Sequence, residues 1–137
     1  MKEYVILKVN SIPDWNAVPV LAVDTILWEP DCGIRMTQQL CYDETALYVR
    51  QRAWEANIRA EYSAPLSPVH EDSCMEFFFA FGADGCYFNF EINPNACLEL
   101  GFGLDRKNRV RLCHKAELET FRLRCVRTTD GWVAEYR

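Results

Sequence analysis

Residues 74–93 read CMEFFFAFGADGCYFNFEIN, and this stretch decides the fold class. Residues 74–81 are apolar enough for a central strand with both faces largely covered. Residues 83–85, Ala-Asp-Gly, are a hairpin turn signal. In the strand that follows, Phe88, Phe90 and Ile92 lie on one face, which we expect to be buried. The opposite face carries four polar residues: Tyr87, Asn89, Glu91 and Asn93.

The rest of the chain repeats this alternation in short segments. Further strands are expected at 40–43, 45–52, 97–102, 110–113, 121–127 and 132–136, with Asp130-Gly131 as a second hairpin turn. Residues 53–62 allow a helix assignment but lack caps, and the loop at 63–72 is rich in proline. Turn signals about every 8–12 residues predict an all-β fold. We expect an antiparallel β-sandwich, immunoglobulin-like or jelly-roll-like, with little helix, over residues 1–137.

The last predicted strand runs almost to Arg137, and no closing turn follows it. A sandwich that lacks its last strands exposes an unpaired edge. The sequence therefore predicts either that the domain is shortened at its C-terminus or that another element covers this edge.

The composition excludes several classes of partner. The chain has 137 residues, about one domain, and its 8 Phe, 6 Tyr and 4 Trp exclude disorder. A net charge of −5 argues against nucleic acid and against an anionic membrane. No apolar run approaches the roughly 20 residues of a membrane helix. The apolar run at 4–7 is too short for a secretory signal, so a cytoplasmic location is expected, or an extracellular one if a signal was removed.

Seven cysteines are present, and none forms a C-x-x-C pair. A zinc ribbon needs close ligand pairs, and a disulfide framework prefers an even number of cysteines. We interpret them as mostly buried thiols in a reducing compartment. The tryptophans, at 15, 28, 54 and 132, are interpreted as core or edge packing.

Polar residues gather at 70–73 (His-Glu-Asp-Ser), at Glu76 and along the polar face of 87–93. If 74–81 and 87–93 pair, Glu76 approaches Glu91 on one face of the sheet. Carboxylates and amides on a sheet suit hydrogen bonds to sugar hydroxyls, and they also provide oxygen ligands for Ca²⁺. The alternative is a solvated sheet face beside an acidic loop.

Catalytic motifs are weak by comparison. A pair of carboxylates suggests glycoside hydrolysis as an activity, since that reaction needs two carboxyl groups roughly 5–10 Å apart. Nothing else supports catalysis, since there is no Ser-His-Asp arrangement and His114 follows Cys113 in a predicted strand. Residues 101–106 begin like a dinucleotide loop but lack its third glycine, so we expect a turn there.

The motifs PVHEDSCMEFFF at 68–79 and YFNFEIN at 87–93 resemble the family nine carbohydrate-binding modules, most closely the small family nine-like bacterial proteins. Leu47-Tyr48-Val49-Arg50 and Gly101-Phe102-Gly103 extend the resemblance over about 40–137. It implies a non-catalytic β-sandwich that binds the chain ends of oligo- or polysaccharides in an aromatic-walled slot, often with structural calcium.

The family's binding residues match this sequence at some positions and not at others. Glu76 matches a family glutamate that hydrogen-bonds sugar hydroxyls, and the family's stacking tryptophan falls at His70. A family arginine aligns with Glu91, and the second slot wall comes from a C-terminal segment that this chain does not contain. The candidate carbohydrate-binding residues are His70, Glu71, Glu76, Asn89, Glu91 and Asn93, and no metal ligand is assigned. A structural or interaction domain without sugar binding is the runner-up, and a glycosidase the third alternative.

Overall fold

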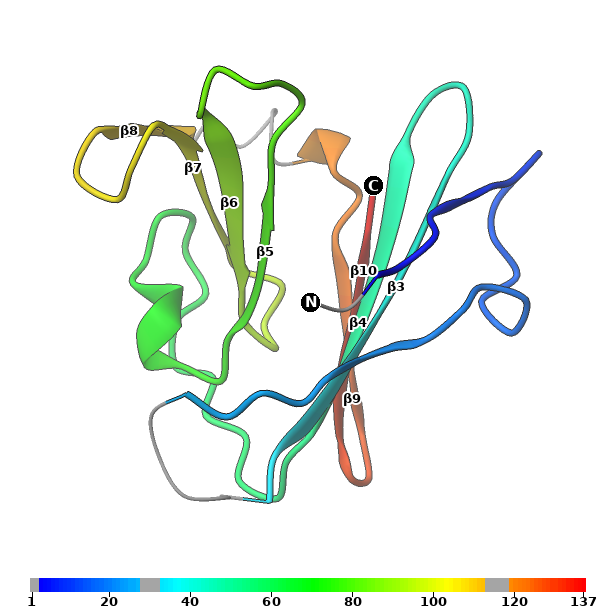
Figure 1. The fold of residues 1–137 in the computed structure, drawn as a ribbon. Helices are drawn as coiled ribbons and strands as arrows, with labels where there is room; N and C mark the ends of the chain where they lie inside the picture. The colour runs from blue at the N-terminus through cyan, green and yellow to red at the C-terminus, as the bar shows by residue number, and fades with distance from the viewer. Residues whose placement is uncertain (1–2, 28–32, 113–118) are drawn as a thin grey trace. The chain divides into compact units, whose positions relative to one another are not determined.

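The hairpin of residues 74–93 forms as the alternation predicts. In the computed structural model, which describes residues 3–27, 33–112 and 119–137, β5 (Met75–Phe79) pairs antiparallel with β6 (Tyr87–Ile92). The sheet continues through β7 (Leu98–Gly103) and β8 (Arg109–Leu112), in the order β5-β6-β7-β8 (Figure 1). Gly101 and Gly103 therefore lie within a strand, and the turn predicted at 101–106 begins only after β7.

One face of this sheet is apolar and carries a ladder of phenylalanines. Phe90 and Ile92 are buried as predicted, and Phe88 is half-buried. The ring of Phe88 lies 4.5 Å from that of Phe102 and 5.1 Å from that of Phe79, between ring centroids. Aromatic contacts across neighbouring strands thus hold the register of β5, β6 and β7.

The opposite face is polar, but it is buried over much of β6. Asn89, Glu91 and Asn93 are all buried. Two elements help to shield this face: the side chain of Arg109 crosses it from β8, and the short 3₁₀ helix η1 (Val69–Glu71) packs against β6. The alternative of a solvated sheet face is therefore wrong for Asn89, Glu91 and Asn93, whereas Glu76 of β5 on the same face is exposed.

A second, six-stranded sheet contains the remaining strands. They are β1 (Leu7–Lys8), β2 (Leu21–Val23), β3 (Arg35–Tyr42), β4 (Leu47–Trp54), β9 (Arg124–Thr128) and β10 (Gly131–Tyr136). The order is β1-β3-β4-β10-β9, with β2 also on β3, and only the β1–β3 pair is parallel.

β3 begins at Arg35 rather than at residue 40, because buried glutamines hide its pattern. Gln39 donates through Nε2 to the carbonyl oxygens of Trp15 (2.7 Å) and Val18 (2.8 Å). Gln51 on β4 donates to Gln38 and accepts from the Tyr136 hydroxyl. Buried polar side chains need such partners, and here they fix the N-terminal segment and β10 to the sheet.

β10 lies inside its sheet rather than at an edge. It pairs antiparallel with β4 on one side and with β9 on the other. Trp132 is buried on this strand and donates through its indole N–H to the Glu55 carboxylate, at 2.5 Å. Of the two alternatives for the last strand, cover by another element therefore agrees with the structure, since β9 pairs with it, whereas a shortened domain stays a prediction. The buried position of Trp132 agrees with its interpretation as a packing residue.

The predicted all-β class is confirmed, and two sheets rich in antiparallel pairs are consistent with a β-sandwich. Residues 53–62 form no helix, because 53 and 54 belong to β4 and the rest are irregular. Within the described ranges, no helix has the length and apolar character that crossing a membrane requires. Of the cysteines, 41, 74, 86, 97 and 125 are free thiols, and two of these are buried. Cys32, Cys113, His114 and Trp28 lie outside the described residues.

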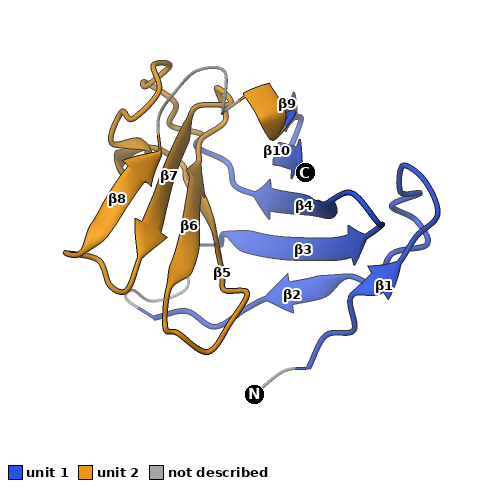
Figure 2. Cartoon of the chain, turned by 90° about the horizontal axis from the view of Figure 1, so that it is seen from above, with its two compact units in different colours: residues 1–57, 122–137 blue, residues 58–121 orange. Residues whose placement is uncertain are grey.

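Two compact units divide the chain (Figure 2). One comprises residues 1–57 and 122–137 and holds the six-stranded sheet; the other comprises residues 58–121 and holds the four-stranded sheet. The assignment of residues 1–137 to one domain stays a prediction.

The buried phenylalanine face gives a direct stability test. Phe90→Ala should lower the free energy of unfolding by about 3–5 kcal/mol, because it leaves a cavity among packed rings. Asn89→Ala should cost about 1–3 kcal/mol, since it removes a buried acceptor of the Arg109 guanidinium. Val110→Ala, at an exposed site on β8, is the control and should change little. Urea melts measure all three, and equal losses for Phe90→Ala and Val110→Ala would contradict the packing.

Candidate functional site

Three glutamates on neighbouring strands form a row across the polar face of the four-stranded sheet. Glu76 on β5 pairs with Glu91 on β6, which pairs with Glu99 on β7. Glu91 is 6% exposed and Glu99 is 1% exposed. Like charges directly opposite one another destabilise a sheet, and buried charges need compensation. This glutamate row therefore requires cations beside it.

Two arginines of β8 supply these cations. Arg109 donates through Nη1 to Asn89 Oδ1 at 2.6 Å and through Nη2 to Glu91 Oε1 at 3.3 Å. Its Nη2 also lies 4.0 Å from Glu99 Oε1, and Arg111 Nη2 lies 3.0 Å from the same oxygen. Because Arg109 and both of these carboxylates are shielded from water, their attraction is stronger than at a surface. The arginines thus hold the buried part of the glutamate row in place.

Two glycines make room for Arg109 on the sheet. A Cβ atom at Gly101 would lie 2.9 Å from Cδ of Arg109, and one at Gly103 would lie 2.3 Å from the backbone oxygen of Asn108. Both distances are shorter than van der Waals contact. Gly101 therefore lets the Arg109 side chain lie across β7 and reach β6, and Gly103 lets the backbone at the start of β8 approach closely.

A pocket of about 570 Å³ opens on this face, and all its lining residues belong to residues 58–121. We call it the charged pocket. Its aromatic part is formed by Phe78 and Tyr87, whose ring centroids lie 5.8 Å apart. The remaining lining residues are charged or titratable: His70, Glu76, Glu91, Glu99, Arg106, Lys107, Arg109 and Arg111. The charged pocket thus combines apolar ring surface with donors and acceptors of hydrogen bonds.

The pKa of Glu76 is raised above its ordinary value of 4.5. Desolvation by the surrounding sheet is the largest cause, and the neighbouring carboxylate of Glu91 adds to it. Asn89 and Arg109 oppose this effect only in part. Glu76 therefore gives up its proton less readily than a free glutamate, at a position where it lines the charged pocket.

Asp72 and Asn93 form a separate buried network that fixes the loop before β5. The Asp72 carboxylate accepts hydrogen bonds from the backbone amides of Glu61 and Tyr62 and from Asn93 Nδ2, at 2.8–3.1 Å. Asn93 also donates to the Tyr62 carbonyl and accepts from the amides of residues 95 and 97. Burial alone would raise the pKa of Asp72, but these hydrogen bonds lower it below the ordinary value. This network supports η1 and hence the position of His70.

The structure brings together half of the sequence-predicted site residues. His70, Glu76 and Glu91 line the charged pocket. Asn89 lies on the same face and holds Arg109, whereas Asn93 belongs to the buried network and Glu71 accepts a hydrogen bond from the Tyr62 hydroxyl. A role of any of the six in sugar binding stays a prediction. The lining residues that sequence reasoning missed are Phe78, Tyr87, Glu99, Arg106, Lys107, Arg109 and Arg111.

Calcium, which the resemblance implies, takes six to eight oxygen ligands. Within the described ranges, the acidic, histidine and cysteine side chains come together in one cluster of three, formed by His70, Glu91 and Glu99. A cluster with one nitrogen and two carboxylates does not match a calcium cage. Structural calcium stays a prediction for this chain.

Comparison with known proteins shows the family and the fold. The profile of carbohydrate-binding family 9 matches residues 8–128, and the chain belongs to this family. A similar solved structure is the crystal structure of a "putative carbohydrate-binding protein" from Bacteroides uniformis ATCC 8492. The two share 20% sequence identity with a TM-score of 0.77, over 96% of this chain and 69% of that chain, which is a likeness of fold. No curated protein sequence gives a significant match. Family membership confirms the resemblance found in the sequence and supports carbohydrate binding in general.

The space left by Gly101 can be tested by filling it. Gly101→Ala should lower the free energy of unfolding by about 1–3 kcal/mol, because the new methyl group displaces Arg109. Gly82→Ala is a matched control, since a methyl group at that position would meet no atom within 4 Å. In an Arg109→Ala background, Gly101→Ala should cost clearly less, which a double-mutant cycle in urea measures. Equal cost in both backgrounds would show that Arg109 is not what the glycine accommodates.

The Asp72 network predicts a dependence of stability on pH. Because the pKa of Asp72 is lower in the folded chain, its stabilisation is present above the ordinary value of 3.8 and is lost as pH falls through the folded value. Asp72→Asn should therefore lower the free energy of unfolding near neutral pH, by about 1–3 kcal/mol. The difference from the wild type should shrink in acid. A difference that stays constant over the acid range would contradict this account.

Proposed function

We propose that the chain is a non-catalytic carbohydrate-binding protein and that the charged pocket holds the sugar. The observation that carries the proposal is the presence of hydrogen-bonding carboxylates and guanidinium groups beside two aromatic rings in one pocket of a family 9 member. Its volume, about 570 Å³, lies within the range of small-molecule sites. The similar structure from Bacteroides uniformis, described as a "putative carbohydrate-binding protein", supports the same function.

The polar groups suit the hydroxyls of a sugar. A sugar hydroxyl donates one hydrogen bond and accepts others, so it can bridge a carboxylate and a guanidinium. Glu76 supplies an acceptor that reaches solvent, and Arg109 supplies donors fixed in direction by Asn89 and Glu91. Hydrogen bonds to charged groups are stronger than those between neutral groups. Glu76 and Arg109 therefore orient the sugar in the pocket.

The aromatic rings suit the apolar C–H surface of a pyranose. Phe78 is 53% exposed, which is unusual for a phenylalanine in a strand, and it lies beside Tyr87 in the same pocket. The resemblance places a family tryptophan at His70, whose ring is smaller and more polar. In this chain Phe78 and Tyr87 take over the role of the apolar platform.

The arrangement of the carboxylates favours binding without hydrolysis. The buried carboxylates of Glu91 and Glu99 are held by arginines and lie in one row with Glu76 on a single sheet face. A glycosidase instead places its two carboxyl groups on either side of the scissile bond. Binding at the terminal unit of an oligosaccharide or polysaccharide is what the family resemblance implies, and a volume of about 570 Å³ suits a short segment of sugar chain.

Oligosaccharide titration followed by NMR or calorimetry tests this proposal. The wild type should give saturable binding, with shifts at Glu76, Phe78 and Tyr87. Glu76→Gln should weaken binding about tenfold or more through loss of a charged hydrogen bond. Phe78→Ala should weaken it by about 3–10-fold through loss of ring contact.

Two matched controls accompany these variants. Phe81→Ala removes a ring that is 88% exposed and does not line the pocket, and Glu61→Gln neutralises an exposed glutamate outside the pocket. Both should bind like the wild type. An absence of saturable binding to any oligosaccharide would favour the interaction domain without sugar binding, and turnover that Glu76→Gln abolishes would favour a glycosidase.

A further inference from the structure

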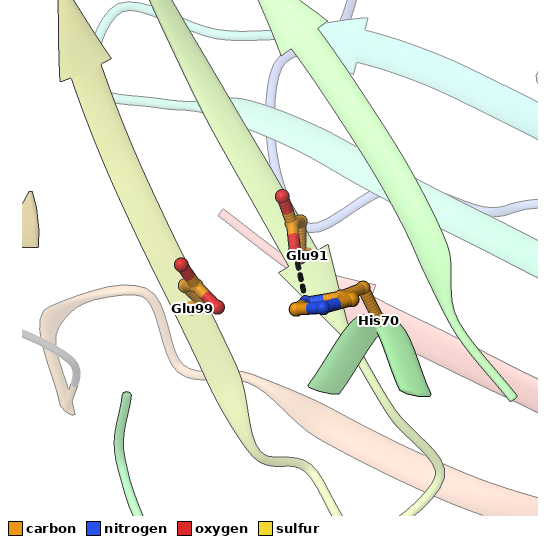
Figure 3. A group of neighbouring side chains, drawn as sticks. All are labelled: His70, Glu91 and Glu99. Atoms are coloured by element: carbon orange, nitrogen blue, oxygen red, sulfur yellow. Dashed lines mark ion pairs between the residues drawn. The ribbon is translucent and has the colours of Figure 1, made fainter. Parts of the chain in front are cut away.

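We infer that the inner end of the charged pocket is also a binding site for a divalent transition-metal ion, of the zinc class, with His70, Glu91 and Glu99 as ligands. Figure 3 shows the three side chains: His70 comes from η1 and points toward Glu91, and Glu99 lies on the neighbouring strand. This inference does not depend on the proposed sugar binding, because it concerns different side-chain atoms of the same pocket.

The donor atoms of the three side chains lie close enough together for one ion to contact all of them after a small movement. One donor atom from each lies within 4.8 Å of the other two. The Nδ1 atom of His70 lies 3.7 Å from Oε2 of Glu91, too far for a hydrogen bond. Ligand atoms around a tetrahedral zinc ion are about 3.3 Å apart, given bonds of about 2.0–2.1 Å. The His70 side chain is 48% exposed and sits on a short 3₁₀ turn, so its rotation can supply the remaining approach.

The hydrogen bonding of the carboxylates independently indicates a ligand. Oε2 of Glu91 and Oε2 of Glu99 are both buried and have no hydrogen-bond partner among the described residues. In each carboxylate the other oxygen, Oε1, is the one that an arginine of β8 holds. A buried charged oxygen without a donor is costly. A cation between these oxygens and His70 would remove that cost.

The set of donor atoms indicates which class of ion fits. One imidazole nitrogen and two carboxylate oxygens suit zinc and related ions such as cobalt or manganese, whereas calcium and magnesium prefer oxygen ligands alone. Three protein ligands leave a fourth position for water or a ligand oxygen. Because all three residues line the charged pocket, that position faces the pocket.

The arginines of β8 both support and oppose such an ion. By holding Oε1 of each carboxylate they fix its direction, as groups outside the ligand shell do in metal sites. Their positive charges also repel a cation. The third carboxylate of the glutamate row, Glu76, offsets part of this repulsion. Arg111 is more than half exposed, so it can turn into solvent when an ion binds. Removal of Arg111 should therefore strengthen metal binding, a result that a purely structural role of the cluster does not predict.

The test is a titration of the full chain with Co²⁺ or Zn²⁺ alone, after removal of metals with a chelator. Calorimetry should show one saturable site, and the Co²⁺ absorption spectrum should indicate nitrogen and oxygen ligands. His70→Ala and Glu99→Gln should each weaken binding at least about tenfold, and Arg111→Gln should strengthen it several-fold. Glu61→Gln, the same change at an exposed glutamate outside the pocket, should leave it unchanged.

Several outcomes would overturn the inference. These are no saturable uptake, equal affinity in the wild type and His70→Ala, or a near-ultraviolet thiolate band that places Co²⁺ on cysteine. Since Glu99 is buried and its variant can fail to fold, His70→Ala at an exposed position keeps the test decisive. Oligosaccharide titration of the same preparation separates the two proposals: saturable sugar binding without metal uptake contradicts only the metal site, and metal uptake without sugar binding contradicts only the proposed function.

Discussion

Arg109 lies across the four-stranded sheet, with its guanidinium against Asn89 and Glu91 and within reach of Glu99. Without this cation, two buried carboxylates on adjacent strands would repel each other in a medium that screens charge poorly. The requirement explains why β7 carries glycines where the arginine passes, and why β8 alternates Arg109 and Arg111 with an exposed valine. The charged pocket exists because these opposite charges neutralise each other without filling the space above the sheet.

The elements that sequence reasoning predicted correctly are those in which local pattern and environment agree. The alternation of β6 and the turn at 83–85 specify a hairpin, and its phenylalanine face is buried as expected. The burial of the polar face of β6 could not be predicted, because it depends on Arg109. No local sequence pattern links Arg109 to β6. Likewise, β3 begins earlier than expected because Gln38 and Gln39 are polar and yet buried.

The site was predictable only where residues share one short segment. Glu76 and Glu91 follow from the hairpin register, but Glu99 required the register of β7, and Arg109 required that of β8. Gly101 and Gly103 were read as a turn, although glycine within a strand is itself a sign that another group approaches closely. Phe78 lies in a run of consecutive apolar residues, so the sequence did not show which of its rings face the pocket. The pairing of β5 with β6 places Phe78 on the polar face of the sheet.

The unit of residues 58–121 is continuous in sequence, whereas the other unit joins residues 1–57 to residues 122–137 (Figure 2). During synthesis, β4 therefore leaves the ribosome long before its neighbour β10 exists. The four-stranded sheet with its charged pocket can form as its strands emerge one after another, since every pair in it is between consecutive strands. One side of β4 therefore stays unpaired until β10 is synthesised, close to the end of translation. Translation thus completes the unit of residues 58–121 before the six-stranded sheet, and the open side of β4 is an unpaired strand edge in the nascent chain, where aggregation can begin.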